Sequence, residues 1–146
     1  MVVASLKIAP LDKGSEDSFL EFVNRDRIDN YYVLYDLRYL RDRARIWLAA
    51  DSGAIRAYMM EYDGRVIHVR GDPACVSALL GKSVLLAPLL NIEPRHLAVV
   101  SQRFEPVEPA DRHTDGLITT FLTLKVTSQS FRPLIHHDVQ ELNQTH

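Results

Sequence analysis

The densest pattern of apolar positions lies in the middle of the chain, where three apolar runs are separated by short polar breaks. The runs cover residues 44–50, 54–62 and 65–70. The second break is Asp63-Gly64, and an Asp-Gly pair between apolar runs is a strong signal for a type I′ hairpin turn. Alternation in the third run is only partial, which is typical of an inner strand. The pattern therefore predicts a three-stranded antiparallel meander.

A helix is predicted directly after the meander, over residues 74–80. Asp72 is placed to cap the N-terminus of this helix, and Pro73 fits the first turn, where no backbone N–H is required. Gly81 is the expected stop. The central stretch thus predicts three strands followed by a helix.

The flanking sequence adds further elements. Before the meander, the spacing predicts a strand over residues 2–8 ended by Pro10, a helix capped by Ser15 and ending near Arg25, and a helix over 29–39. After it, we predict a buried strand over 83–87, a helix over 93–104, a loop over 105–116, a strand over 117–127, and a short strand with a helix start over 132–142. The expected fold class is α/β (α+β), a mixed, mostly antiparallel sheet of about six or seven strands flanked by helices.

Composition narrows the class of protein. A length of 146 residues fits one domain, and a net charge of −2 gives no electrostatic argument for a nucleic-acid or membrane partner. Cys75 is the single cysteine, so no intrachain disulfide can form and a reducing, cytoplasmic setting is expected. No signal peptide is recognisable, and no apolar run approaches the roughly 20 residues of a membrane span.

Several side chains are candidates for chemistry, each with a structural alternative. His68 is either a general base at the centre of a strand or a packed or exposed histidine. The tyrosines at 31, 32, 35 and 39 either line an aromatic pocket or are core and rim residues of a helix. Cys75 lies among apolar helix positions, which favours a buried thiol over a nucleophile.

Two further stretches carry polar groups of note. His136, His137, Asp138 and His146 contain metal-ligating side chains, but adjacent histidines in a strand face opposite ways, so no metal site is expected. The acidic, proline-bearing loop from Glu105 to Asp115 is either mobile or a binding lid, and the sequence does not separate the two.

The order of predicted elements resembles the GNAT superfamily of acyl-coenzyme A dependent N-acetyltransferases. Three short stretches, FVNRD at 22–26, NYYVLYDL at 30–37 and HVRGD at 68–72, look more closely like the N-terminal, non-catalytic GNAT-like domain of two-domain archaeal acetyltransferases. The resemblance covers most of residues 1–131. Residues 132–146 resemble the first few residues of a second domain.

The resemblance also shows a departure from the catalytic family. Active members carry Arg/Gln-x-x-Gly-x-Gly/Ala where the central strand enters the helix, and its backbone N–H groups bind the cofactor diphosphate. Here Val69, Arg70 and Gly71 are the corresponding positions, followed by the anionic Asp72 and by Pro73, which lacks an N–H. The alternative to a strand-to-helix turn with a capping aspartate is a remnant phosphate loop.

Three functions follow as expectations. The first is a degenerate, non-catalytic domain that binds no cofactor and packs against a catalytic acetyltransferase domain, or dimerises in its place. The second is a small N-acetyltransferase acting on an amine, with acetyl-coenzyme A at Val69, Arg70 and Gly71 and with Tyr35 or His68 in proton transfer, since a tyrosine is the general acid in many acetyltransferases. The third is an interaction scaffold unrelated to acyl transfer, because fold does not fix function. For the first, a homo-oligomer is the expected state.

Overall fold

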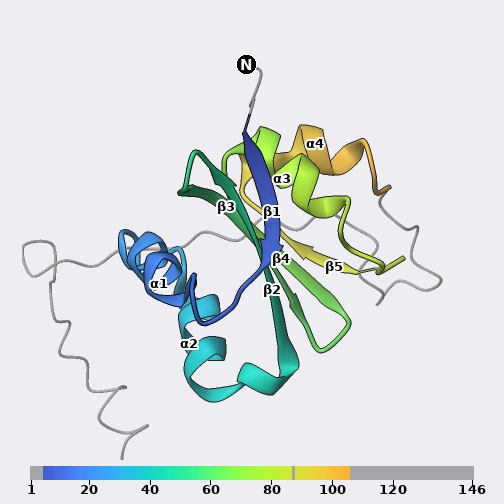
Figure 1. Ribbon diagram of the computed structural model, residues 1–146. Helices are drawn as coiled ribbons and strands as arrows, with labels where there is room; N and C mark the ends of the chain where they lie inside the picture. Colours follow the sequence, from blue (N-terminus) through green and yellow to red (C-terminus); the bar gives the residue numbers. More distant parts are fainter. Residues whose placement is uncertain (1–4, 87, 106–146) are drawn as a thin grey trace, which may run out of the picture.

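The computed structural model describes residues 5–86 and 88–105. Strands, α-helices and 3₁₀ turns follow one another along the chain (Figure 1). In order, they are β1 (Leu6–Pro10), α1 (Glu16–Asn24), α2 (Tyr31–Tyr39), η1 (Arg41–Arg43), β2 (Ala44–Asp51), β3 (Ala54–Tyr62), β4 (Val66–Gly71), α3 (Pro73–Leu80), β5 (Leu89–Asn91), η2 (Pro94–His96) and α4 (Leu97–Ser101).

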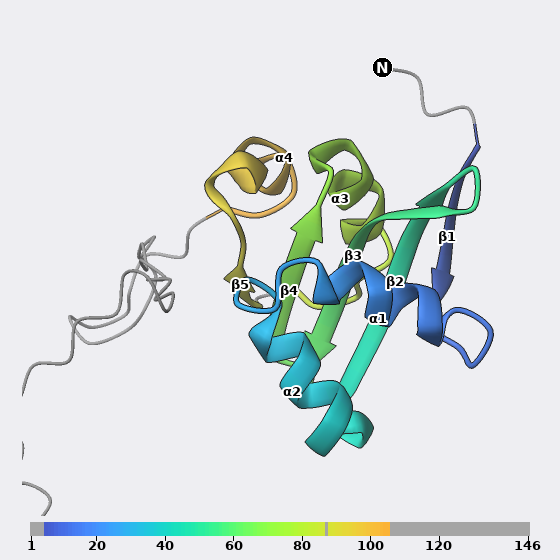
Figure 2. The same cartoon turned by 90° about the vertical axis from the view of Figure 1, so that its left-hand side faces the viewer.

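The five described strands form one sheet in the order β1-β2-β3-β4-β5. Neighbours run antiparallel except β4 and β5, which are parallel. Helices α1 and α2 cover one face of the sheet, and α3 and α4 cover the other (Figure 2). The predicted meander and the predicted fold class, a mixed and mostly antiparallel sheet flanked by helices, are therefore confirmed.

Both faces of the central strands are buried, which explains why their sequences alternate so weakly. On β3, Met59 packs into the core beneath α3, whereas Tyr58 and Met60 pack into the core beneath α1 and α2. A strand covered on both faces needs apolar residues at successive positions, not at every second one. Burying two apolar layers in this way fixes the position of β4, which carries the residues discussed below.

The turn and cap predictions also hold. Asp63 and Gly64 have φ angles of 55° and 66°, and the Arg65 N–H donates to the Tyr62 carbonyl across 3.0 Å, as a type I′ turn requires. Asp72 caps α3, because its Oδ1 accepts the Ala74 N–H at 2.9 Å. The helix ends at Leu80, before Gly81. These features depend on local geometry, which the residue types specify directly.

The strand predicted over residues 83–87 is wrong. Residues 83–86 form no strand, and β5 begins only at Leu89, beyond Pro88. Val84 and Leu86 are 79% and 94% exposed, so the apolar run is not buried within the described structure. Ser83 offers a local alternative, since its Oγ accepts the Leu85 N–H at 3.2 Å.

Smaller differences lie at element ends. Ser15 precedes α1 as predicted, but its side chain bonds Asp12 and caps no N–H of the helix. The helix predicted from residue 29 begins at Tyr31, and the one predicted over 93–104 consists of η2 followed by the short α4.

Other predictions lie outside the described residues. These are the start of the first strand at residues 2–4, the loop beyond Glu105, the strand over 117–127, the tail over 132–142 with its histidines, and the second-domain start at 132–146. Among the residues that are described, no helix is both long and apolar enough to cross a membrane.

Candidate functional site

The candidate site is the place where β4 and β5 stop pairing, which is called the gap below. The two parallel strands pair only from Val66 to His68 on β4 and from Leu89 to Asn91 on β5. Beyond His68, strand β4 continues through Val69, Arg70 and Gly71, while the chain after β5 turns towards η2. The three positions that the resemblance assigned to a cofactor are therefore the part of β4 that lies beyond its pairing with β5.

Arg70 closes the gap from one side. Its side chain is only 11% exposed, and its Nε donates to Asp29 Oδ1 at 3.1 Å. Its Nη2 donates to Asn91 Oδ1 at 3.1 Å, and its Nη1 donates to the carbonyl oxygens of Asn91 at 3.3 Å and of Val69 at 2.7 Å. The guanidinium is thus committed to acceptors of the protein itself, in charge-assisted bonds that join β4 to β5 and to the α1–α2 loop.

Replacing Arg70 by glutamine should cost about 2 kcal/mol of unfolding free energy, because hydrogen bonds to a charged donor are lost in a mostly buried position. Arg43→Gln is the matched control, since Arg43 pairs with Asp63 on the surface, where ion pairs contribute about 1 kcal/mol or less. Urea unfolding measures both. Equal losses for the two variants would contradict the role assigned to Arg70.

Gly71 is required by packing. Its φ is 114°, and a Cβ built there would lie 2.3 Å from the Arg56 carbonyl oxygen and 2.5 Å from Ala57 Cα. The glycine therefore allows β4 to approach β3 closely at the end of the strand. Its presence needs no bound ligand to explain it.

The junction of β4 and α3 does not fit a diphosphate. The Asp72 N–H donates to the Arg56 carbonyl at 3.0 Å, Pro73 has no N–H, and the Ala74 N–H donates to Asp72 Oδ1 at 2.9 Å. Three successive positions thus have no N–H to offer an anion. The Asp72 carboxylate also places a negative charge at the helix N-terminus, where a phosphate would otherwise be favoured.

His96 closes the gap from the other side, and the sequence reasoning missed it. The side chain is fully buried in η2. Its Nδ1 accepts the Glu93 N–H at 3.3 Å, so the proton lies on Nε2, which donates to the Gly71 carbonyl at 2.7 Å. The available signal was the spacing from Glu93 to His96, which is that of a capping box with histidine in place of Glu or Gln.

His68 lies in the core beneath α2, with 2% of its surface exposed. Its ring stacks on Tyr58 at a centroid distance of 5.9 Å and meets the edge of Tyr32 at 6.2 Å. Within the described part of the chain, its Nε2 is buried without a hydrogen-bond partner. Burial, together with the nearby Arg70 charge, lowers the pKa of His68 to about 3, so the ring is neutral at pH 7.

Tyr58 is a further buried titratable group, and it lies on β3 opposite Arg70. Its hydroxyl donates to Asn30 Oδ1 at 2.7 Å, and the Asn30 amide donates to the Val23 and Asp26 carbonyls at 3.2 and 3.0 Å. Burial raises the pKa of Tyr58 far above its ordinary value, so the phenol keeps its proton. This arrangement anchors the α1–α2 loop on the sheet.

The side chains of Tyr35 and His68 do not lie together. Its ring lies 4.9 Å from Tyr39 and 6.2 Å from Tyr31 on the outer side of α2, whereas the aromatic neighbours of His68 are Tyr32 and Tyr58. The structure therefore does not bring the two candidate proton-transfer residues together.

Of the two interpretations of the α2 tyrosines, as pocket lining or as core and rim residues, the structure excludes only a place in the core. Their exposed fractions run from 44% to 59%, because the core positions of α2 are taken by Val33 and by the half-buried Leu34 and Leu37. A surface groove of about 420 Å³ runs along three of them, Tyr31, Tyr35 and Tyr39. Its lining consists of Arg27, Ile28, Tyr31, Leu34, Tyr35, Arg38 and Tyr39.

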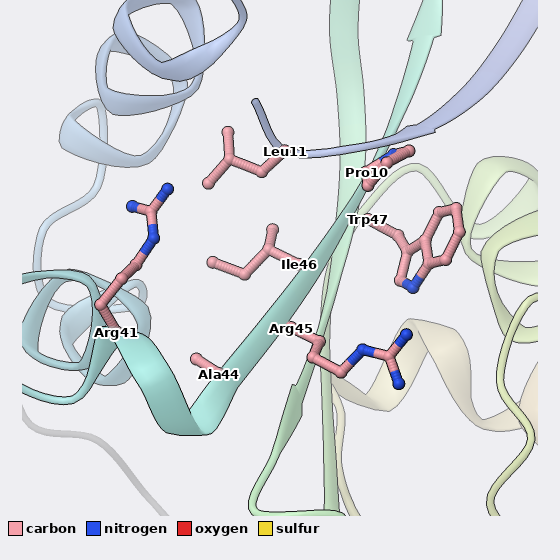
Figure 3. A pocket seen from close by; sticks show the side chains of 7 residues that line it. All are labelled: Pro10, Leu11, Arg41, Ala44, Arg45, Ile46 and Trp47. Atoms are coloured by element: carbon pink, nitrogen blue, oxygen red, sulfur yellow. The ribbon is translucent and has the colours of Figure 1, made fainter. Parts of the chain in front are cut away.

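A second hollow, of about 200 Å³, lies where β1 ends at Pro10 and β2 continues (Figure 3). Leu11 and Ile46 line it together with Arg41 and Arg45, whose guanidinium groups point away from each other in Figure 3. Arg41 is also paired with Glu16 at 3.4 Å. The two arginines therefore do not converge on a point where an anion would sit.

Among the described residues, neither a reactive thiol nor a metal site adds chemistry to the candidate site. Cys75 is 1% exposed, as predicted, and burial raises the pKa of its thiol. No cluster of three or more metal-ligating side chains is present among residues 5–86 and 88–105.

No protein-family model matches the chain, and no curated protein is significantly similar to it. Among solved structures, it is similar to the crystal structure of a ribosomal-protein-alanine N-acetyltransferase from Brucella melitensis biovar Abortus 2308. The two are 16% identical with a TM-score of 0.45, over 80% of this chain and 100% of the other. A similarity at this level transfers neither the fold nor the activity of that protein, so the functional argument rests on the geometry described above.

Proposed function

We propose that this chain is a degenerate, non-catalytic GNAT-like domain that packs against a catalytic acetyltransferase domain or dimerises in its place. One observation carries the proposal. The backbone at the β4–α3 junction, where the resemblance puts a cofactor diphosphate, has its donors at residues 72–74 used internally or absent, and it carries a capping carboxylate.

The gap between β4 and β5 supports the same function. Arg70 bonds to Asn91 from β4, and His96 bonds to the Gly71 carbonyl from η2, so two sets of hydrogen bonds hold its sides together. A ligand entering between the strands would have to replace these bonds. Each is buried or nearly so, and the loss of a buried hydrogen bond without replacement costs about 1 to 3 kcal/mol.

The titratable groups beside the gap also suit a structural role. A general base must accept a proton near neutral pH. His68 does not do so with a pKa of about 3, and the buried Tyr58 holds its proton against Asn30. Tyr35 lies on the outer side of α2 with the other tyrosines. His68, Tyr58 and Tyr35 are therefore not poised for proton transfer.

Calorimetric titration of the whole chain with acetyl-coenzyme A tests the proposal. We expect no heat of binding and no change in thermal midpoint at millimolar ligand. Saturable binding with a micromolar dissociation constant, equivalent to about −8 kcal/mol, would overturn it and favour the alternative, an acyl-coenzyme A dependent N-acetyltransferase.

A further inference from the structure

We infer that residues 117–127 of this chain pair with the outer edge of β5, as a parallel strand that extends the sheet and covers its apolar margin. This segment lies outside the described residues. The inference goes beyond the proposed function, because it assigns one edge of the sheet and the segment that occupies it. It holds whether or not a cofactor binds at the β4–α3 junction.

Strand β5 has one described neighbour, and its outer edge is open. It pairs with β4 alone and is the last strand of the described sheet (Figure 2). The Leu89 N–H donates to the Arg65 carbonyl at 2.9 Å, just before β4. Backbone groups alternate in direction along a strand, so the N–H and C=O of Leu90 point away from β4. They are a template for one more strand.

Apolar side chains at this edge are incompletely covered. Leu89 is 58% exposed, and Val84 and Leu86 in the preceding loop are 79% and 94% exposed. On the face covered by α3 and α4, the outer layer of the core is only partly buried, and it includes Leu90, Ile92, Val99 and Phe104. Because β5 is only three residues long, a neighbouring strand gains few hydrogen bonds here, and covering these side chains supplies most of its stabilisation.

Residues 117–127 have the composition of such a neighbour. The segment is rich in β-branched residues and contains no proline, glycine or carboxylate. Alternate positions from Ile118 to Val126 hold Ile, Thr, Leu, Leu and Val, whereas those from Thr119 to Thr127 hold Thr, Phe, Thr, Lys and Thr. Since side chains alternate between the faces of a strand, one face is mostly apolar. We place this face over the partly buried layer beside α4.

The length of chain beyond the described structure favours a segment of this chain over a separate partner. The described residues end at Glu105, shortly after α4, and residue 117 follows twelve positions later. Twelve residues span up to about 40 Å when extended, which exceeds the diameter of a small domain, about 30 Å. A segment tethered this closely has an effective concentration of about millimolar, which gives it an advantage over a separate chain.

The position of α4 favours the parallel direction. Strand β4, helix α3 and strand β5 already form one crossover between parallel strands. Helix α4 lies on the same face as α3, since Val100 joins the core that contains Leu79 and Leu80. A second outward step with its helix on the same face has the same hand as the first, and such crossovers are right-handed in nearly all proteins.

Amide hydrogen exchange of the full ¹⁵N-labelled chain tests the pairing. We expect the Leu90 amide to exchange at least about 100-fold more slowly than the Ile8 amide, after correction for local sequence. Ile8 is the matched control at the opposite edge of the described sheet. The Leu11 N–H donates to the Ile46 carbonyl, so by alternation the Ile8 N–H points away from β2. Equal rates at Leu90 and Ile8 would overturn the inference.

Nuclear Overhauser contacts of the Leu90 amide identify what covers the edge. We expect contacts to residues 117–127 of the same molecule. Contacts to another segment, or to a second copy in a mixture of labelled and unlabelled chains, would overturn the inference. Close Hα–Hα contacts across the pair, which antiparallel neighbours make, would overturn the parallel direction. The measurement uses the unsubstituted chain, so it does not depend on whether a variant folds.

A pair of proline variants tests whether the segment itself protects the edge. Proline has no N–H and disrupts pairing within a sheet. We expect Leu122→Pro to speed exchange at Leu90 at least about 10-fold, and Gln129→Pro, which lies just beyond the segment, to leave the rate unchanged. Slow exchange of the Met59 amide in the central strand β3 shows that each variant remains folded. A folded Leu122→Pro chain with Leu90 still protected would overturn the inference.

Discussion

Gly71→Ala is expected to cost at least about 3 kcal/mol and to leave the protein largely unfolded at 37 °C. Two costs add at this position. A φ of 114° is strained for any residue with a Cβ, and that Cβ would lie 2.3 Å from the backbone oxygen of Arg56, which cannot move without breaking the β3–β4 pairing. Urea unfolding followed by circular dichroism measures the loss.

Gly64→Ala separates the two costs. Gly64 also has a positive φ, 66°, but a Cβ there meets nothing within 4 Å. We expect this variant to lose only about 1 kcal/mol, which is the conformational cost alone. Should the two alanine variants be equally stable, the close approach of β4 to β3 at Gly71 would not be a constraint on the fold.

His68→Phe is expected to reduce the loss of stability that the protein suffers on acidification. The folded-state pKa of His68 is about 3, below the ordinary value of 6.5, so the unfolded chain binds more protons between these values. The stability associated with His68 is therefore complete above pH 6.5 and declines as the pH falls towards 3. Each pKa unit corresponds to about 1.4 kcal/mol, so a shift from 6.5 to about 3 gives a total loss of about 5 kcal/mol.

Phenylalanine is the suitable replacement because it keeps the aromatic contacts with Tyr58 and Tyr32 and removes the unpartnered Nε2. At pH 7 the variant should be as stable as the wild type or about 1 kcal/mol more stable. The difference in unfolding free energy between the two proteins, measured from pH 7 to pH 4, isolates the histidine, because the effect of Asp36, whose pKa is raised by burial, is common to both. A difference that does not change with pH would contradict the buried position of His68.

The sequence predicted best those features that depend on neighbouring residues. The Asp63-Gly64 turn needs two residues that tolerate positive φ, and Asp72 with Pro73 is a cap and a first turn whose chemistry is local. The strands joined by such turns could therefore be placed, and their pairing followed from the hairpins. The two-sided burial of β4 was likewise visible in its weak alternation.

The errors concern features that depend on distant contacts. The apolar run at Val84 to Leu86 has the composition of a buried strand, yet the parallel partner of β4 is the stretch from Leu89 to Asn91. Composition alone does not say which of two adjacent apolar stretches lies beside a given strand. Helical spacing likewise did not separate core from rim among the α2 tyrosines, all four of which are exposed.

The residues at the β4–α3 junction could be singled out from the sequence, but their contacts could not. Arg70 and Gly71 were identified from their place between strand and helix, and the poor fit of Asp72 and Pro73 to a diphosphate followed from their chemistry. The hydrogen bonds that close the gap could not be predicted, because Asn91 and His96 lie more than 20 residues further along the chain.

The most direct test of the central claim is a nuclear magnetic resonance titration of the ¹⁵N-labelled chain with coenzyme A, followed at the amides of Gly71, Asp72 and Ala74. These N–H groups belong to the junction that a bound diphosphate would contact. The account predicts that their chemical shifts stay unchanged at millimolar coenzyme A, because Asp72 and Ala74 donate to acceptors of the protein itself. Shifts at these amides that saturate with a single dissociation constant would show that the junction binds the cofactor, and would contradict the account.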